Sequence, residues 1–532
     1  MKIKKICYSL LITLLIGIII FYFVLPPLNI HSILFWFYFL TLLIIFGFSL
    51  LCFSVDCRGR IKDFTKTLTV IAFLASGVVL GIIVINFILS PLFNSKDYAN
   101  RIFIDESKKF QENVAPVDFN ALPLLDKASS QKLGDRVMGQ LPEMVSQFYV
   151  SNLYTQINYN NDIIRVTPLE YNGFFKYLSN RSDGIKGYIT VNSVDGEAKL
   201  VKLDQGIKYA ESAIFQEDLE RYIRFKYPTR IFGEKSFEID NEGNPYWIIP
   251  TISYKGVELR REVSSVIILN PIDGTAEEYK VEDVPTWVDH VYSAGLIIEQ
   301  VNDWGQYKNG FLNSMFGQKN VVQTTEGYNY TTMNDDVYLY TGITSVSSDE
   351  ANIGFILTNM RTKETNFYAV PGAEEYSAMD SAKGQVQQMN YDASFPLLIN
   401  LNNRPTYLLS LKDAAGLVKM YAFVDVEDYQ KVSITDASQG IKKAAENYLN
   451  NVDLKLDTTL NVSKEIEVSK ITNAVIDGTT YYYIIDKEDN KYKASIKINR
   501  ELLPFVEQNQ KIRIKYNIEK EVTEIIEIEF IA

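Results

Sequence analysis

The sequence predicts an α+β protein with an N-terminal bundle of three transmembrane helices, two tandem α+β repeats and a small C-terminal β-barrel of the OB or SH3-like sort. Three observations support this prediction: three long apolar runs, a series of motifs that occurs twice, and period-two alternation near the C-terminus. The chain has 532 residues, enough for several domains. We assign them to a membrane anchor, a linker, repeat 1, repeat 2, a connecting helix and a barrel, at 1–94, 95–133, 134–285, 286–435, 436–454 and 455–532.

The first elements are membrane spans. The apolar runs are Ile6–Leu25, His31–Val55 and Leu68–Phe93, and a helix of about 20 apolar residues crosses a bilayer. A cleaved signal peptide is the alternative for the first run. The stretch "FYFVLPPLNIHS" at the end of this run shows neither the short apolar region nor the small-residue cleavage site of a signal peptide, so we predict three spans.

Basic residues predict the orientation of these spans. They precede the first run and separate the second from the third, whereas the loop "PPLNIH" has none; these residues are Lys2, Lys4, Lys5, Arg58, Arg60, Lys62 and Lys66. Positively charged loops stay in the cytoplasm. The sequence therefore predicts a protein of the cell membrane with a cytoplasmic N-terminus and with residues from about 95 to 532 outside the cytoplasm.

The exported part is acidic and lacks cysteine. The chain has a formal charge of −12, and only Asp56 and Asp63 of its 65 acidic residues precede position 67. Such a charge argues against nucleic acid as a partner and against lying flat on anionic lipid. The three cysteines, Cys7, Cys52 and Cys57, lie in or beside the spans, which leaves no disulfide or thiol chemistry in the exported part.

A series of motifs predicts an internal duplication. The stretches "GDRVMGQLPEM" from Gly134 and "GQYKNGFLNSM" from Gly305 share the pattern G-x4-G-x-L-x-x-M. Strand-turn-strand stretches and a helical stretch then follow in the same order in both halves, about 160–174 residues apart. The predicted repeats run from 134 to about 285 and from 305 to about 432. The alternative is chance similarity among tyrosine-rich strands.

The last match of the series is "DNEGNPYW" from Asp240 and "NLNNRPTY" from Asn400. Asp, Asn and Gly tolerate the left-handed backbone of tight turns, and Pro fixes φ before the next strand. Both stretches are therefore predicted to be turns between strands. Trp247 and Tyr407 then occupy the same place in the returning strand, where core packing is the favoured role.

The C-terminal part is predicted to be a helix followed by a barrel. The stretch "DASQGIKKAAENYLNN" from Asp436 reads as a capped connecting helix. Four or five alternating strands joined by Asp-Gly and Asp-Asn turns follow it, which is typical of a small barrel. We expect this barrel to bind protein or to be purely structural.

Part of the first repeat resembles a PepSY-type domain. A helix, a strand, the turn at Asp240, a second strand and the hairpin "VIILNPIDGTAEEYKV" follow one another, and residues Asn270, Pro271, Gly274 and Thr275 match the family's hairpin. The resemblance implies a helix packed on a small antiparallel sheet. The second repeat departs from the pattern, because Glu427 and Tyr429 stand where that turn would be.

Residues 200–435 also resemble a family of uncharacterised membrane-anchored surface proteins of Gram-positive bacteria. The resemblance rests on "VEDVPTWVDHVYSAGLIIEQ", "TTEGYNY" and "GAEEYSAM". It implies an exported binding or inhibitory scaffold without a known activity.

The sequence singles out no catalytic group. Outside the spans the chain has one histidine, His290, and a structural role is favoured for it. An S-x-x-K at Ser129–Lys132 lacks the partner motifs of penicillin-binding proteins. A calcium loop beginning at Glu238 would need Glu at its twelfth position, which is Ile249. We therefore predict no enzyme activity, no metal and no cofactor.

Aromatic residues form the remaining concentration. They are either a site that stacks on a sugar or anchors a partner, or the seam between the repeats; the candidates are Tyr246, Trp247, Trp287, Tyr292, Trp304, Tyr307 and Tyr407. The predicted function is a non-catalytic scaffold or binding protein of the bacterial cell envelope, whose partner is another envelope or membrane protein and whose possible role is regulation of an envelope enzyme. The alternative is an envelope hydrolase or carbohydrate-binding protein that uses acidic and aromatic residues near the repeat junction.

Overall fold

The chain is mixed α+β, as predicted, and forms two compact units, Met1–Val452 and Asp453–Ala532. This computed structural model describes residues 2–53, 64–119, 122–140, 142–160, 162–333, 335–346, 348–452, 462–476, 479–516, 522–525 and 527–530. The predicted span boundary at Val55, Cys57 and the basic residues Arg58, Arg60 and Lys62 lie outside the described residues.

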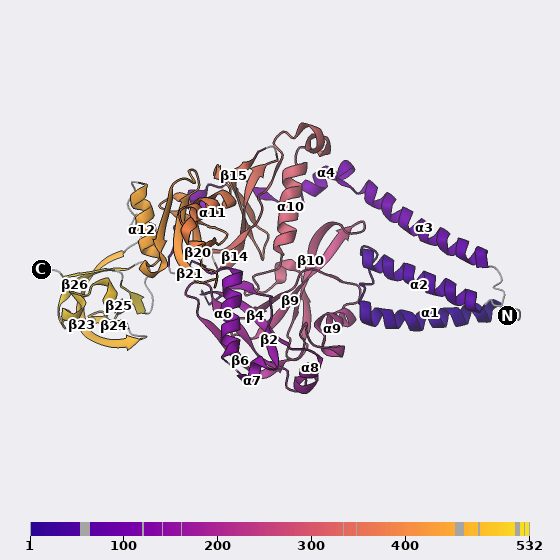
Figure 1. Cartoon of the computed structure of the whole chain (residues 1–532), viewed down its shortest axis with the longest axis horizontal. Coiled ribbons are helices and arrows are strands. Elements are labelled where there is room, and N and C mark those ends of the chain that lie inside the picture. Colours follow the sequence, from indigo (N-terminus) through magenta and orange to yellow (C-terminus); the bar gives the residue numbers. More distant parts are fainter. Residues whose placement is uncertain are drawn as a thin grey trace. The chain divides into compact units, whose positions relative to one another are not determined.

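Three helices at the N-terminus are long and apolar enough to cross a membrane, which confirms the three predicted apolar helices (Figure 1). They are α1 (Lys2–Val24), α2 (Ile33–Cys52) and α3 (Phe64–Ile88). The third ends before the predicted Phe93, because Pro91 begins a separate helix, α4 (Pro91–Ala99). Proline suits the first turn of a helix, where its missing N–H would have no partner.

The connection between α1 and α2 and the end of α3 contact the same part of the unit. The Leu28 N–H donates to the Pro228 carbonyl at 2.8 Å, and His31 Nδ1 lies 2.6 Å from the Gly256 carbonyl. Asn86, a polar residue near the end of α3, exchanges two 2.9 Å hydrogen bonds with the backbone of Val257. The end of α1, the start of α2 and the end of α3 are therefore held at one side of the sheets.

The first half contains two sheets, each of which is preceded by helix. The first sheet follows α6 (Lys127–Gly139). Its strands are β2 (Phe148–Val150), β3 (Thr155–Tyr159), β4 (Asp162–Tyr171), β5 (Ile185–Asn192) and β6 (Ala198–Ile207). They are arranged in the order β2-β4-β5-β6, and β3 also pairs with β4. Between these elements lie α7 (Pro142–Val145) and α8 (Phe174–Asn180). The second sheet follows α9 (Leu219–Lys226) and has the order β7-β9-β10-β11, with β8 also on β9; its strands are β7 (Ile231–Phe232), β8 (Ser236–Ile239), β9 (Pro245–Lys255), β10 (Leu259–Leu269) and β11 (Ala276–Tyr279).

The second half repeats this order of pairing in two further sheets. One follows α10 (Ala294–Tyr307) and contains β12 (Val322–Thr324), β13 (Asn329–Met333), β14 (Asp336–Ser345), β15 (Ser348–Asn359), β16 (Thr365–Tyr368) and β17 (Gly372–Ala373). The other follows α11 (Glu375–Gly384) and contains β18 (Asp392–Ala393), β19 (Leu397–Leu401), β20 (Arg404–Lys412), β21 (Val418–Asp425) and β22 (Val432–Asp436).

Part of the predicted linker, residues 95–133, pairs with the sheets of the second half. Strand β1 (Ile104–Asp105) lies parallel to β16, and α5 (Phe110–Asn113) follows it. The Val117 N–H then donates to the Asn400 carbonyl at 2.9 Å. The chain thus runs along the second half before it forms the first.

Both turns predicted from the sequence are confirmed. The stretch Asp240–Asn244 joins β8 to β9, and Asn402 and Asn403 join β19 to β20. The second turn is shorter, and both of its asparagines have the left-handed backbone of a two-residue hairpin, with φ of 52° and 60°. Strands β9 and β20 hold equivalent places in their sheets; the duplication itself stays a prediction.

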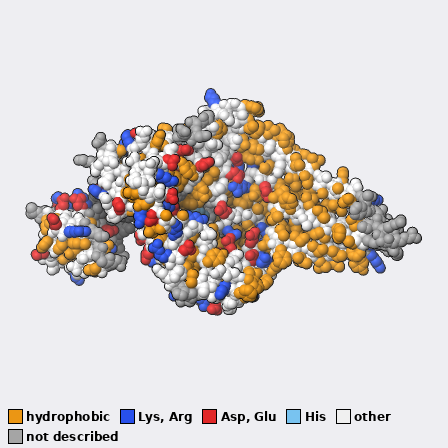
Figure 2. Space-filling view, in the orientation of Figure 1, with side chains coloured by type: hydrophobic (Ala, Val, Ile, Leu, Met, Phe, Trp, Pro, Cys, Tyr) orange, Lys and Arg blue, Asp and Glu red, His pale blue; other side chains and the backbone are white. Residues whose placement is uncertain are grey.

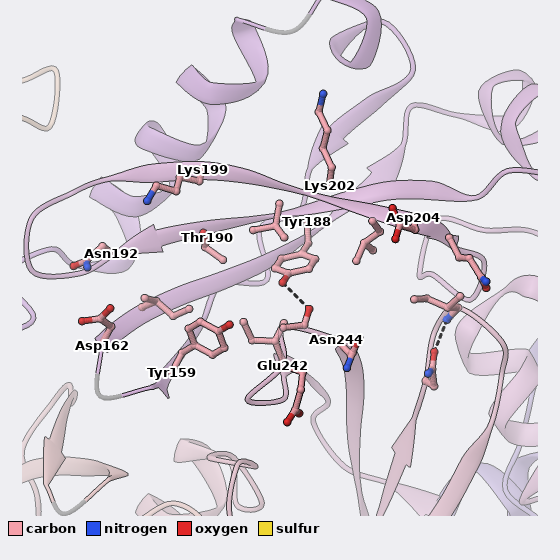
Figure 3. Close-up of a pocket in the computed structure, with 18 of the residues that line it drawn as sticks. Tyr159, Asp162, Tyr188, Thr190, Asn192, Lys199, Lys202, Asp204, Glu242 and Asn244 are labelled. Atoms are coloured by element: carbon pink, nitrogen blue, oxygen red, sulfur yellow. Dashed lines mark hydrogen bonds between the residues drawn. The ribbon is translucent and has the colours of Figure 1, made fainter.

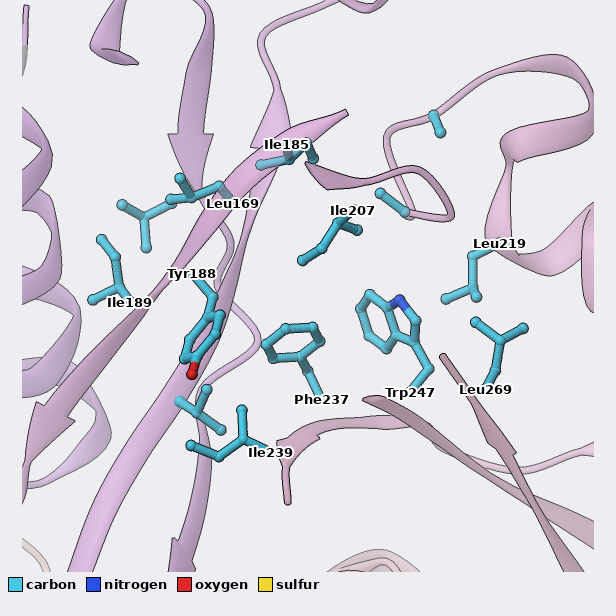
Figure 4. Packing of buried hydrophobic residues seen from close by; sticks show 14 of the residues in the cluster. Leu169, Ile185, Tyr188, Ile189, Ile207, Leu219, Phe237, Ile239, Trp247 and Leu269 are labelled. Atoms are coloured by element: carbon cyan, nitrogen blue, oxygen red, sulfur yellow. The ribbon is translucent and has the colours of Figure 1, made fainter. Parts of the chain in front are cut away.

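The second sheet is buried on both faces, which explains the continuous apolar run of β9. Neighbouring residues of a strand point to opposite faces, so Trp247 packs in the core of the first half while Ile248 packs in a second core with α10. Figure 4 shows Phe237 between Trp247 and Tyr188, with ring centroids 5.2 Å and 6.1 Å away. This sheet therefore joins the two halves.

The connecting helix is shorter than predicted. Asp436 accepts the Ser438 N–H at 2.9 Å and so caps a short turn, Ala437–Gln439. Helix α12 (Ile441–Asn451) begins only after Gly440, whose φ of 82° breaks the helical run.

The second unit has one sheet of the order β27-β25-β24-β23-β26-β28. Its strands are β23 (Val462–Ile476), β24 (Thr479–Asp486), β25 (Lys491–Ser495), β26 (Lys511–Tyr516), β27 (Val522–Glu524) and β28 (Glu527–Phe530). The long strand β23 pairs with both β24 and β26, and the two edge strands are consecutive in the chain. The second unit has a hydrophobic core that includes Val468, Ile512 and Ile514.

Candidate binding groove

The aromatic residues predicted as site or seam lie in separate environments. Trp247 is fully buried in the core of the first half, whereas Tyr246, Trp287, Tyr292 and Trp304 belong to the second core, where Tyr246 and Trp287 are 5.0 Å apart. Tyr307 contacts Tyr98 of α4. Tyr407 is buried and donates to the Ala373 carbonyl at 3.0 Å. They pack inside the protein rather than around one cavity.

His290 lies at the junction of the two halves and has a structural partner. Its Nε2 is 2.7 Å from the Gln156 carbonyl, so this nitrogen carries the proton and donates. Its ring meets the edge of Tyr330 at 5.4 Å. Glu238, the first residue of the rejected calcium loop, is buried and accepts the backbone N–H groups of Asp289 and His290 at 2.8 Å and 3.2 Å.

A groove of about 760 Å³ lies between the first sheet and two turns of the second sheet. One wall is formed by β4, β5 and β6, and the other by the turn Asp240–Asn244 and the turn between β10 and β11. Figure 3 shows Tyr188 pointing from the sheet toward the first turn, with Tyr159 beside it. The volume falls in the range of small-ligand and peptide sites.

Hydrogen bonds within the turn Asp240–Asn244, which forms part of one groove wall, fix its conformation. Asp240 accepts the N–H groups of Glu242 and Asn244 at 3.1 Å and 2.8 Å. Gly243 has a φ of 84°, and its carbonyl accepts the Tyr188 hydroxyl at 2.8 Å. Glycine is favoured here because L side chains rarely adopt this left-handed backbone.

A bulge in β6 forms part of the other wall. The pairing of β5 with β6 shifts from Ile185–Ile207 to Gly187–Lys202, which leaves extra residues on β6. A bulge redirects side chains out of the regular ladder. Leu203, Asp204 and Gln205 line the groove for this reason.

The groove carries an excess of negative charge. Five carboxylates and two lysines line it, and one of the lysines, Lys199, is paired with Glu197 at 2.7 Å. The other, Lys202, extends away from the turn in Figure 3. Within the described part of the chain no ion pair involves the remaining four carboxylates, which are Asp162, Asp204, Glu242 and Asp273.

The carboxyl groups whose pKa is raised by burial lie elsewhere. Burial raises the pKa of Glu170 to about 7 and that of Asp303 to about 6. Burial, and then the charge of Glu238, raises the pKa of Asp289 well above its ordinary value. None of these groups lines the groove. Among the described residues no cluster of His, Cys, Asp or Glu could hold a metal.

The sequence predicted the turn Asp240–Asn244, which forms part of one groove wall, but it did not predict the groove. Its other residues come from β3 to β6, and single Asp, Lys and Tyr residues on strands give no motif. The bulge between Lys202 and Ile207 contains Gly206, and a single glycine inside a strand pattern is the one signal that could have indicated it.

No protein-family model and no curated protein matches this chain. The groove therefore supplies the argument for function.

Proposed function

We propose that this protein is a non-catalytic, membrane-anchored scaffold of the bacterial cell envelope whose groove binds a basic segment of another envelope or membrane protein. The observation that carries the proposal is a set of four carboxylates in one groove that form no ion pair with any residue the structure describes. Such a site favours lysine and arginine, and the two tyrosine rings add a surface for cations. Binding is favoured over catalysis because the carboxyl groups with a raised pKa lie outside the groove.

The groove predicts affinity for a cationic peptide. The probe is a fluorescein-labelled Lys-Ser-Gly repeat with four lysines, titrated against the full chain in nanodiscs and followed by anisotropy. The quadruple variant Asp162→Asn, Asp204→Asn, Glu242→Gln and Asp273→Asn should bind about tenfold more weakly, because each exposed charge contributes a few tenths of a kcal/mol or more. Binding by the natural chain should weaken as salt screens these charges.

The matched control neutralises four exposed acids outside the groove that also lack ion pairs among the described residues, namely Asp135, Glu326, Asp380 and Glu427. This control has the same net charge as the groove variant. If the control variant binds the peptide as weakly as the groove variant does, binding depends on overall charge and the groove proposal is wrong.

We extend the proposal to the orientation predicted from the sequence. The support is that the α1–α2 connection and the end of α3 contact the sheets, which leaves the start of α1, the end of α2 and the start of α3 on the other side. The sheets then lie outside the cytoplasm.

Thiol labelling tests this orientation. In a chain whose three cysteines are replaced by serine, an impermeant maleimide added to intact protoplasts should label Glu427→Cys and spare Lys4→Cys. Permeabilised cells should show labelling of both. Labelling of Lys4→Cys alone in intact protoplasts would place the sheets in the cytoplasm.

The finer fold assignments are also proposals. Support for PepSY-like repeats comes from the helix-then-sheet order and from the hairpin at Asn270, whose side chain accepts the Ile272 N–H at 2.9 Å. Support for an OB-like barrel comes from β23, which pairs on both sides, and from the parallel pairing of β25 with β27.

The second candidate function is carbohydrate binding. The observation that favours it is the pair Tyr159 and Tyr188 in a polar groove, since tyrosine rings stack on sugars and amides bind hydroxyls. A neutral N-acetylglucosamine hexamer serves as the probe. Binding of this hexamer that is insensitive to salt and to the quadruple variant would favour the second candidate over the first.

A further inference from the structure

Two patches of exposed apolar side chains adjoin the outer ends of the membrane helices. The α8 patch consists of Phe174, Phe175, Leu178, Phe215 and Phe225, and the η3 patch, on the short turn η3 (Asn313–Gly317) and the residue before it, consists of Leu312, Met315 and Phe316. Phe175 is 78% exposed and Phe316 is 83% exposed. Large rings at such exposure mark contact surfaces.

The α8 patch is connected to the outer end of α1. Phe225 meets Phe21 of α1 edge-on at 5.5 Å. The Arg221 guanidinium covers the Tyr22 ring at 4.5 Å and donates to the Phe215 carbonyl at 2.7 Å. The Tyr177 hydroxyl of α8 donates to the Ile214 carbonyl at 2.7 Å, which completes the connection from α1 to α8.

The η3 patch is connected in the same way to the outer end of α3. Phe87 of α3 contacts Phe93 of α4 at 5.3 Å, and Tyr98 of α4 contacts Tyr307 of α10 at 5.9 Å. Tyr307 stacks on Phe311, one residue before the patch. The outer ends of α1 and α3 thus each have an exposed apolar patch connected to them.

Basic residues accompany both patches, although the exported part as a whole is acidic. Lys176 and Arg181 lie on or just after α8, and Lys308 and Lys319 flank η3. Exposed aromatic and aliphatic side chains beside Lys and Arg are typical of surfaces that enter the headgroup region of a bilayer. Figure 2 shows hydrophobic side chains over α1–α3 and again at the lower edge of the unit, where Figure 1 places α8.

We propose that the α8 and η3 patches dock on the outer leaflet of the membrane, so that the first unit rests on lipid at two points in addition to its three spans. This inference rests on the proposed membrane orientation. The bilayer is the occupant because both patches continue directly from the helices that it surrounds. Local apolar and basic groups make the contact, while the acidic groove stays free for its partner.

Lipid quenching tests the proposal on the full chain. The cysteine-free chain, with one copy per nanodisc of phosphatidylcholine and phosphatidylglycerol, receives an NBD label at Phe175→Cys, Leu178→Cys or Phe316→Cys. Doxyl-phosphatidylcholine is then added to the lipid. Leu417→Cys is the control, because Leu417 is 41% exposed, like Leu178 at 40%; Leu80→Cys in α3 reports on the spans.

We expect quenching at 175, 178 and 316 to exceed that at 417 at least twofold. Quenching at only one patch, or at neither, overturns the proposal, and a blue-shifted but unquenched label would identify a protein as the occupant. The label at position 80 distinguishes a failure of the proposed membrane anchor from a failure of the proposed docking. If it is not quenched, the membrane anchor itself is wrong; if it is quenched while both patches are not, only the docking is wrong.

Discussion

Trp247→Ala is expected to lower the free energy of unfolding by about 3–5 kcal/mol, the usual cost of removing a buried tryptophan ring. Trp247 is fully buried, its ring packs on Phe237 at 5.2 Å, and its Nε1–H donates to the Tyr209 carbonyl at 3.0 Å. Alanine leaves a cavity and removes that donor. The melting temperature of the chain in nanodiscs, followed by near-UV circular dichroism, measures the effect.

Two variants separate the causes of this loss. Trp247→Phe keeps a ring but leaves the Tyr209 carbonyl without its donor, and should cost about 1–3 kcal/mol. Trp304→Ala removes a half-buried ring covered by Lys308 at 3.8 Å, and should cost less than Trp247→Ala. Equal losses for Trp247→Ala and Trp304→Ala would contradict the central place of Trp247 in the core.

The Trp247→Ala substitution should also weaken peptide binding in the groove. Phe237 lies between Trp247 and Tyr188, and the Tyr188 hydroxyl holds the turn at Gly243. A cavity behind Phe237 lets this ring and then Tyr188 shift. We therefore expect Trp247→Ala to reduce peptide binding even at temperatures where the protein is folded.

The sequence predicted the spans, the turns and the mixed α+β class because each has a local physical signal. An apolar run must form a helix in lipid, and Asn, Asp and Gly next to Pro signal a tight turn. The end of α3 was misplaced because the apolar run continues through Pro91, where hydropathy does not change but a new helix begins.

The groove and the burial of β9 on both faces could not be predicted in this way. The run "YWIIP" from Tyr246 predicts a buried strand, but whether one core or two receive it depends on α10, about 50 residues later. The grouping of Trp247, Trp287 and Trp304 in the sequence suggested one cluster. Alternation along β9 instead places Trp247 in a different core from the other two.

Glu238→Ala is expected to destabilise the junction of the two halves by about 3–5 kcal/mol. The Glu238 carboxylate is fully buried and accepts the Ser236 hydroxyl at 2.7 Å together with the N–H groups of Asp289 and His290. Alanine leaves these buried donors without an acceptor, and each such group costs about 1–3 kcal/mol.

The conservative variant Glu238→Gln is compared in stability with the natural chain and with Glu238→Ala. Glutamine keeps one oxygen, but its amide nitrogen meets a backbone N–H where the second oxygen stood, so its stability should fall between that of the natural chain and that of Glu238→Ala. Glu242→Ala, four residues later on the exposed rim of the groove, is the matched control and should change stability by no more than about 0.5 kcal/mol.

The pH dependence of stability adds a readout that a loss of packing would not change. The folded pKa of Asp289 is raised by burial and by the charge of Glu238, so the folded protein binds more protons at this group than the unfolded chain does. Its contribution to stability is therefore lost as pH rises above the unfolded value of about 4. Glu238→Gln removes the neighbouring charge and should make this fall in stability with pH shallower. A parallel fall in both proteins, measured from pH 4 to pH 8, would contradict the coupling of these two carboxyl groups at the junction.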